Sequence, residues 1–279
     1  MISFFRICCL LILLPVLSQA QDTIRTHIKL GNLTQEEIKL SHNLKIVHIY
    51  AEGGKLFKEY FLKNGKKDSL AKLFDMTGLV SFQQYKDGKL NGLEVWLHTL
   101  DTNLQFVSVE DMQKIYSALD SSYSFSGVVS IAEYKNGLLH GTEKMFASSP
   151  PGGVSYATHY ANGKKDGVDI GFRRDGTKTF EIYYKDGKQS GLETYYDSNG
   201  KIFSECNWIN GKKNGLYKYY RNGILYGEDN YTNDMQEGIS RDFYENGEVK
   251  YIDTFKKGKK LNRKMYDENG KQIFSQDYP

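Results

Sequence analysis

Residues 184–201, YKDGKQSGLETYYDSNGK, hold one complete copy of a unit that recurs along the chain. A tyrosine precedes an Asp-Gly turn, a second glycine follows at Gly191, and two tyrosines precede a second turn at Asn199-Gly200. The pattern starts again at Trp208, 24 residues after Tyr184. A fixed period of this length is the signature of a repeat architecture, so we read the chain as an array of similar units.

Three series of glycines keep this period along the chain. The glycines of the first turn are Gly65, Gly88, Gly137, Gly163, Gly187, Gly211 and Gly258. Those that follow each first turn are Gly92, Gly141, Gly167, Gly191, Gly215 and Gly238. The third series marks the second turns: Gly54, Gly78, Gly176, Gly200, Gly223, Gly247 and Gly270. Asn-Gly and Asp-Gly are typical of two-residue hairpin turns, and the runs between turns alternate as strands do. The sequence therefore predicts an all-β protein, an elongated single-layer antiparallel meander of ~24-residue hairpins.

Aromatic residues keep the same phase as the glycines. One ring precedes each first turn, as at Tyr184, Trp208 and Tyr231, and strand alternation predicts that these rings form a ladder on one face. We expect the second glycine series to lie where backbone or rings come too close for a side chain. Rings serve either the packing of the sheet or a binding platform. The candidate aromatic binding face is Trp96, Tyr195, Tyr196, Trp208, Tyr219, Tyr220, Phe243 and Tyr244.

Three stretches differ from the repeats. Residues 1–20 combine Arg6, an apolar run and a Ser-Gln-Ala site, which predicts a cleaved signal peptide and an exported protein, periplasmic or extracellular. Residues 21–49 are expected to cap the array at 50–279, and the part around 33–40 fits a short helix or a strand equally. Helical spacing after Ser108 predicts an inserted helix at 108–120 in a disrupted unit, which either covers the sheet or acts as a lid or docking element.

Composition and motifs exclude several function classes. The net charge of +3 among 279 residues provides no strong field for nucleic acid. The six histidines form no metal-binding pair, the acidic residues recur in turns, and no nucleophile or phosphate-binding motif is present. After signal cleavage Cys206 would be the one cysteine left, and its place in a strand indicates a packed residue. We expect no enzyme activity, no cofactor and no metal.

The repeated unit, Y-x-[ND]-G-K-x-x-G-x-x-x-x-[YF]-[YF]-x-x-[ND]-G, resembles the MORN repeat in its bacterial variant with paired turns. His140-Gly141 matches a pair common in such units, and the resemblance covers residues ~50 to 279. It implies an aromatic-lined single-layer sheet and a scaffold for protein or membrane contact. Some similar proteins carry an antitoxin label, but an export signal argues against that role.

The expected function is a non-catalytic, exported scaffold that binds a protein, and we expect a monomer. The alternatives are a module that binds a glycan or an anionic surface, and an antitoxin-like neutraliser. The basic end, Lys256–Lys260 with Arg263 and Lys264, fits an anionic surface or a solvated turn that protects the last strand from pairing.

Overall fold

The computed structural model describes residues 24–75, 78–97, 128–147 and 153–279, and within these ranges every regular element is a β-strand. This confirms the all-β prediction. The predicted helix at 108–120 and the predicted signal peptide at 1–20 lie outside the described residues. The chain divides into two compact units, one ending at Leu138 and the other continuing from Leu139, and each is described by itself.

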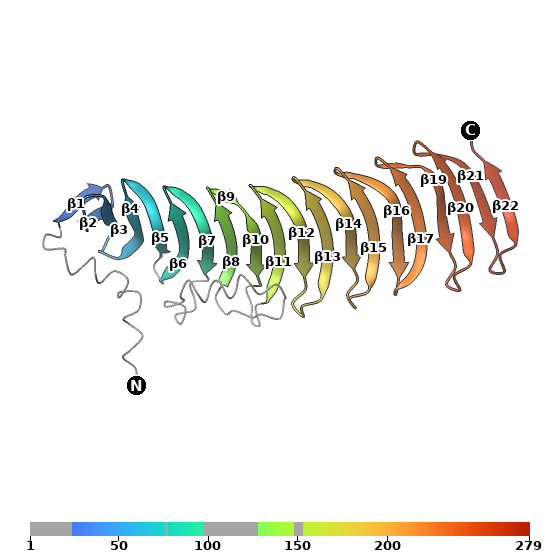
Figure 1. The fold of residues 1–279 in the computed structure, drawn as a ribbon. Coiled ribbons are helices and arrows are strands. Elements are labelled where there is room, and N and C mark those ends of the chain that lie inside the picture. The colour runs from blue at the N-terminus through green and yellow to red at the C-terminus, as the bar shows by residue number, and fades with distance from the viewer. Residues whose placement is uncertain (1–23, 76–77, 98–127, 148–152) are drawn as a thin grey trace. The chain divides into compact units, whose positions relative to one another are not determined.

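Unit 1 is an antiparallel meander in which each strand pairs with the next one along the chain (Figure 1). Its strands are β1 (Ile24–Leu30), β2 (Leu33–Lys39), β3 (Leu44–Tyr50), β4 (Leu56–Lys63), β5 (Lys66–Phe74), β6 (Leu79–Lys86), β7 (Lys89–Leu97) and β8 (Val128–Lys135).

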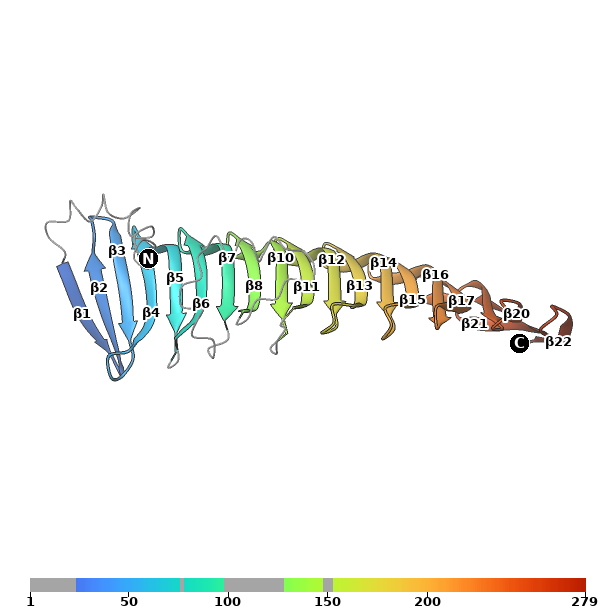
Figure 2. The same ribbon diagram turned by 90° about the horizontal axis from the view of Figure 1, so that it is seen from below.

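Unit 2 continues with the same topology, and Figure 2 shows the strands of each unit side by side in one layer. Its strands are β10 (Gly141–Phe146), β11 (Val154–Ala161), β12 (Lys164–Phe172), β13 (Lys178–Lys185), β14 (Lys188–Tyr196), β15 (Ile202–Ile209), β16 (Lys212–Arg221), β17 (Ile224–Thr232), β18 (Met235–Gln236), β19 (Gly238–Phe243), β20 (Val249–Lys256), β21 (Lys259–Tyr266) and β22 (Gln272–Asp277). The two-residue strand β9 (Leu138–Leu139) lies at the boundary of the units.

The segment expected to cap the array consists of ordinary sheet strands. Leu33–Lys39 adopts the strand alternative, and its backbone pairs with β1 on one side and β3 on the other. A helix would have to give up both ladders, so the strand is favoured.

The first turns have the geometry that the Asn-Gly and Asp-Gly pairs predict. Asn210 and Gly211 have φ values of 53° and 80°, and the six predicted turn glycines Gly88, Gly137, Gly163, Gly187, Gly211 and Gly258 lie between 76° and 87°. Successive turns are also bonded to each other. The Gly211 amide, for example, donates to the Gln189 carbonyl at 2.8 Å. The turns of unit 2 therefore form a continuous edge.

The second glycine series pairs directly with the rings of the next hairpin. Gly191 lies opposite Trp208 and Gly215 opposite Tyr231. The prediction of a close approach is confirmed in part. A neighbour does come close, but it is a different side chain from the ring that pairs with the glycine. A Cβ on Gly191 would lie 3.0 Å from the Cβ of Tyr183, which precedes the ring residue Tyr184 on the neighbouring strand.

The buried residues change in character between the units. Unit 1 buries apolar side chains such as Val47, Phe82, Val95 and Ile131. Beyond β13, the buried side chains of unit 2 are mainly polar: Thr194, Ser204, Ser240 and Asp253, together with Cys206. Burial raises the pKa of the Cys206 thiol to about 11, which agrees with its prediction as a packed residue.

Candidate functional site

The rings predicted to form one binding face lie on both faces of the sheet in unit 2. Tyr195 and Tyr219 both pair with Ser204, so they lie on one side together with Trp208. Tyr196 and Tyr220 are the next residues along their strands and point to the opposite side. The prediction of a single aromatic face is therefore corrected. Consecutive strand residues cannot share a face.

The remaining predicted rings do not complete a common face. Trp96 lies in unit 1 and is 40% exposed. Phe243 ends β19 opposite Val249, at a shift of register. Tyr244 follows the strand, and its hydroxyl donates to the Tyr266 carbonyl at 2.9 Å.

We call the side with the pre-turn rings Tyr184, Trp208 and Tyr231 the ring face of unit 2. Lysines lie between these rings. The Lys165 Nζ is 4.9 Å from the centroid of Tyr184, and the Lys213 Nζ is 5.7 Å from that of Trp208 and 5.5 Å from that of Tyr231. An ammonium over an aromatic face is attracted by the ring quadrupole. The ladder of rings is thus bound together by cations that the sequence analysis did not assign.

Buried carboxylates on the ring face are satisfied by their neighbours. Asp169, which is 2% exposed, accepts hydrogen bonds from the hydroxyls of Tyr156 at 3.0 Å and Thr158 at 2.9 Å and forms an ion pair with Lys165. Such a network stabilises the packing of adjacent strands, because an unpaired buried charge would be costly.

A second carboxylate lies further along the same face. Asp253 accepts two hydrogen bonds of 2.7 Å from the Arg263 guanidinium and forms an ion pair with Lys260 at 2.7 Å. Burial alone would raise the pKa of this carboxyl. The hydrogen bonds and charges of Arg263 and Lys260 outweigh burial and lower the pKa below its usual value.

Tyrosine hydroxyls bond to acids on both faces. Tyr219 donates to Asp242 at 2.5 Å on the ring face, and Tyr220 donates to Glu205 at 2.7 Å on the opposite face. Burial, together with the neighbouring carboxylate, raises the pKa of both phenols, that of Tyr220 to about 12. Both hydroxyls therefore serve as hydrogen-bond donors at neutral pH.

The side opposite the ring face carries exposed apolar residues at equivalent positions of successive hairpins. The residue that follows each second-series glycine is Leu192, Leu216 or Ile239, and these side chains are 39–43% exposed. Tyr183 lies on the same side and is 40% exposed. We call these four residues the apolar stripe. The sequence analysis did not identify the apolar stripe, because it considered only aromatic positions. The aliphatic residues recur with the same period as the glycines, and this period could have indicated the stripe.

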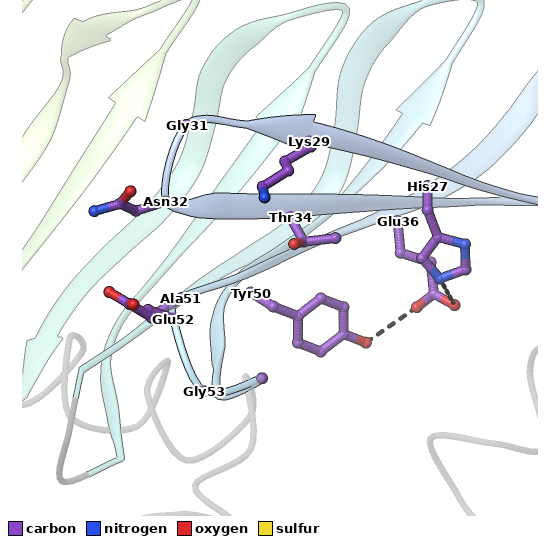
Figure 3. Close-up of a pocket in the computed structure, with 11 residues that line it drawn as sticks. His27, Lys29, Gly31, Asn32, Thr34, Glu36, Tyr50, Ala51, Glu52 and Gly53 are labelled. Carbon is purple, nitrogen blue, oxygen red and sulfur yellow. Dashed lines mark hydrogen bonds and ion pairs between the residues drawn. The ribbon is translucent and has the colours of Figure 1, made fainter.

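A cavity of about 540 Å³ lies in unit 1 between the β1–β2 and β3–β4 turns (Figure 3). His27, Lys29, Glu36 and Tyr50 line it, and the Tyr50 hydroxyl donates to Glu36 at 3.0 Å. The lining residues are mostly polar and the cavity is open to solvent. The Glu36 carboxylate already has hydrogen-bond partners within the protein, Tyr50 and His48.

Glu36 belongs to a row of alternating basic and acidic residues across five neighbouring strands: His27, Glu36, His48, Glu59 and Lys72. His48 lies between the two carboxylates, 3.2 Å from each. Hydrogen bonds from His48 and Tyr50, with the charge of Arg25, lower the pKa of Glu36 against the effect of burial. No motif search could find this row, because each member comes from a different strand.

Two searches of the described residues bear on function. The described ranges contain no group of three or more His, Cys, Asp or Glu side chains placed to bind a metal ion. No helix within them is long and apolar enough to cross a membrane.

Comparison with known proteins identifies the repeat. Residues 189–210 and 236–257 match the model of the MORN repeat variant family. A comparison with curated proteins found no significant match. The first matched segment spans β14 and β15 with the second turn between them. The second begins at the end of β18 and spans β19 and β20. Both matched segments are MORN repeat variants, and the strand–turn unit that they share recurs in the described sheet, which supports a MORN repeat protein; repeats of this family suggest a binding role and are generally non-enzymatic.

Proposed function

We propose that this protein is an exported scaffold that binds another protein through the apolar stripe of unit 2. The observation that carries the proposal is the regular exposure of Leu192, Leu216 and Ile239 on an open sheet face. Single exposed apolar residues are common, but these three occupy the same position of successive hairpins and so offer a partner a regular series of contacts. In unit 2 the stripe repeats with the hairpin, so a partner would meet one apolar contact in each unit.

The polar residues between these contacts suit a protein partner. Leu192 pairs with Asn207 across the ladder, Leu216 pairs with Asn230, and Ile239 pairs with Thr254. Amide and hydroxyl groups beside apolar side chains are typical of interfaces that form and dissociate, because both sides remain soluble when apart.

The test is affinity capture with residues 21–279 as bait and native envelope and secreted proteins as sources. One variant carries L192S, L216S and I239S. The matched control carries I209S, I224S and M235S, three exposed apolar residues beside turns that are 48–57% exposed. We expect one protein to be retained by the wild type and the control and lost by the stripe variant. Circular dichroism must show that both variants are folded.

A protein retained equally by the folded stripe variant would show that the stripe is not the binding surface. Retention of no protein by the wild type at any salt concentration would overturn the scaffold proposal.

Export is part of the same proposal and has its own measurement. The apolar run and the Ser18-Gln19-Ala20 site support cleavage before Gln21. We expect N-terminal sequencing of the protein from its source to begin at Gln21, outside the cytoplasm. An N-terminus at Met1 on cytoplasmic material would contradict export.

A further inference from the structure

The two edges of the sheet in unit 2 differ in charge. At the first-turn edge, the residue after the turn is a lysine in four of the five hairpins, with Met235 in the fifth: Lys164, Lys188, Lys212 and Lys259. We call these four residues the lysine row. The second turns, at the opposite edge, carry charges that nearly cancel, the six acids Asp175, Asp197, Glu245, Glu248, Asp267 and Glu268 beside the five basic residues Arg173, Arg174, Lys201, Arg221 and Lys271. The net charge of +3 for the whole chain conceals this difference.

The lysine row is exposed and is not neutralised by the protein. All four side chains are exposed, and among the described residues none of them forms an ion pair. Lys185, on the other side of the same turn as Lys188, differs because Asp166 lies 3.0 Å from its Nζ. The four lysines therefore present free ammonium groups to solvent.

The row is held in line by the packing of one turn on the next. The Gly187 amide donates to the Lys165 carbonyl at 2.7 Å, and the Gly258 amide donates to the Gln236 carbonyl at 2.9 Å. The side chain of Lys164 lies along the following turn, with its Cβ 3.7 Å from the place that a Cβ on Gly187 would occupy. Neighbouring strands are ~4.8 Å apart, so Lys164, Lys188 and Lys212 follow one another at roughly 10 Å, whereas the Met235 hairpin separates Lys212 from Lys259.

We propose that the first-turn edge of unit 2 binds an anionic polysaccharide along the lysine row. A linear polysaccharide with one acidic group in each disaccharide repeats its charge at an interval comparable to one hairpin. Its carboxylates or sulfates would pair with successive lysines, and its hydroxyls would meet the exposed polar turn residues Asn162, Asp186 and Asn210.

Two other polyanions fit the row less well. A nucleic acid carries a phosphate every few ångströms, about 3.4 Å per strand in a duplex, and would leave most of its charges without a partner here. A bilayer presents charge over a plane, whereas these cations form a single file at one edge. The lysines lie at the turn ends of the strands and include none of the four residues of the apolar stripe, so this inference does not depend on the proposed protein partner.

The experiment measures binding of the mature chain, residues 21–279, to two polymers with about one acidic group in each disaccharide, hyaluronan (a carboxylate) and keratan sulfate (a sulfate), by titration calorimetry or biolayer interferometry. Neutral dextran, a thymidine oligonucleotide and phosphatidylglycerol vesicles are the comparison ligands. One variant carries K164E, K188E and K212E. The matched control carries K201E, R221E and K271E, exposed residues at the second-turn edge, so that both variants change the net charge equally.

We expect the affinities of the wild type and the control for an acidic polysaccharide to agree within about threefold. The lysine-row variant should bind about tenfold or more weakly, because each exposed ion pair contributes a fraction of a kcal/mol and reversing the charge of a lysine adds repulsion. Affinity should fall as salt rises. The two acidic polymers distinguish a carboxylate site from a sulfate site. The apolar-stripe variant should bind the polysaccharide as the wild type does, so failure of this inference and failure of the protein-binding proposal are separable.

Equal binding by the lysine-row variant and the control would overturn the inference. So would an equal or stronger affinity for the oligonucleotide, which would indicate nonspecific attraction to any polyanion. Binding to the vesicles with none to either acidic polysaccharide would assign the edge to a membrane surface instead. Circular dichroism of both variants accompanies the titrations.

Discussion

At the scale of single residues, glycine is required here for two different reasons. Gly211 occupies a turn at a φ of 80°, with no atom within 4 Å of where its Cβ would be. Gly227 has no such backbone requirement. A Cβ there would lie 2.2 Å from the Tyr219 hydroxyl oxygen, so the residue leaves room for a ring. One glycine serves the backbone and the other serves the packing.

The turn glycine should show a conformational cost alone. We expect G211A to lower the free energy of unfolding by about 1 kcal/mol, because an L-residue is strained at positive φ and no side-chain clash is added. The turn at Lys257-Gly258 offers the opposite change. Lys257 adopts a φ of 47°, where asparagine is more favourable, so K257N should stabilise by up to about 1 kcal/mol. Urea denaturation measures both. A stabilising effect of G211A would contradict this account of the turns.

The packing glycine should show a cost that depends on its neighbour. G227A should destabilise by about 1–3 kcal/mol through overpacking against Tyr219. In a Y219A background the same change should cost much less, because the ring that it would meet is gone. A double-mutant cycle by thermal denaturation measures the difference. Equal costs in the two backgrounds would show that the ring is not the cause.

At the scale of strands and hairpins, side-chain networks join neighbouring strands where aliphatic packing is absent. Asp253 and its cations bond β20 to β21, and Tyr220 bonds β16 to Glu205 on β15. These contacts occupy positions that a thicker protein would fill with leucine or valine. The stability of unit 2 should therefore depend on pH at both ends of the scale.

Removing the charge of Asp253 should weaken its hairpin. D253N should lower the free energy of unfolding by about 1.5–3 kcal/mol, the usual range for a lost charge-assisted hydrogen bond. Since the pKa of Asp253 is lowered in the folded protein, its contribution is present above the ordinary carboxyl pKa and is lost as pH falls through the folded value. The deficit of D253N relative to the wild type should therefore shrink in acid, as measured by urea denaturation across pH.

Tyrosine ionisation should destabilise the sheet in alkali. The pKa of Tyr220 is raised to about 12 in the folded state, so the unfolded chain loses this proton first, near the ordinary value of about 10. Stability from this phenol is complete below that value and is lost between it and pH 12. We expect Y220F to flatten the alkaline loss measured by fluorescence. An unchanged alkaline profile would show that other tyrosines dominate.

At the scale of the molecule, a repeat array places each hairpin in contact with its neighbours alone, so stability is a sum of local terms. The contacts of unit 2 follow this order: from β12 to β16 each strand pairs with the next one in the chain, and β17 pairs with both β18 and β19. A local change should then stay local, unlike a change in the core of a globular domain.

Hydrogen exchange tests this locality. In D253N, amides of β20 and β21 should exchange faster than in the wild type, whereas those of β12 and β13 should keep wild-type rates. Mass spectrometry of peptic peptides resolves these segments. Faster exchange throughout unit 2 would show that the unit unfolds cooperatively as a whole, and that its stability is not a sum of local contributions.

The sequence by itself determined the repeat, the turns and the strand order. Asn-Gly and Asp-Gly pairs dictate hairpins locally, and their period places each hairpin beside the next, so this information is contained in residues close together in the chain. It also correctly marked Gly191 as a site of close approach, although Gly215 has only an ordinary contact at 4.0 Å. The sequence did not decide between a helix and a strand for Leu33–Lys39, because the pairing of this segment with β1 and β3 decides its conformation.

Only the tertiary structure decided which side chains meet. Tyr195 and Tyr196 looked like one binding pair, yet strand alternation sends them to opposite faces. The row from His27 to Lys72, the ion pairs of Asp253 and the line of free lysines each draw on several strands. Cross-strand register brings these residues together, and no local pattern records it.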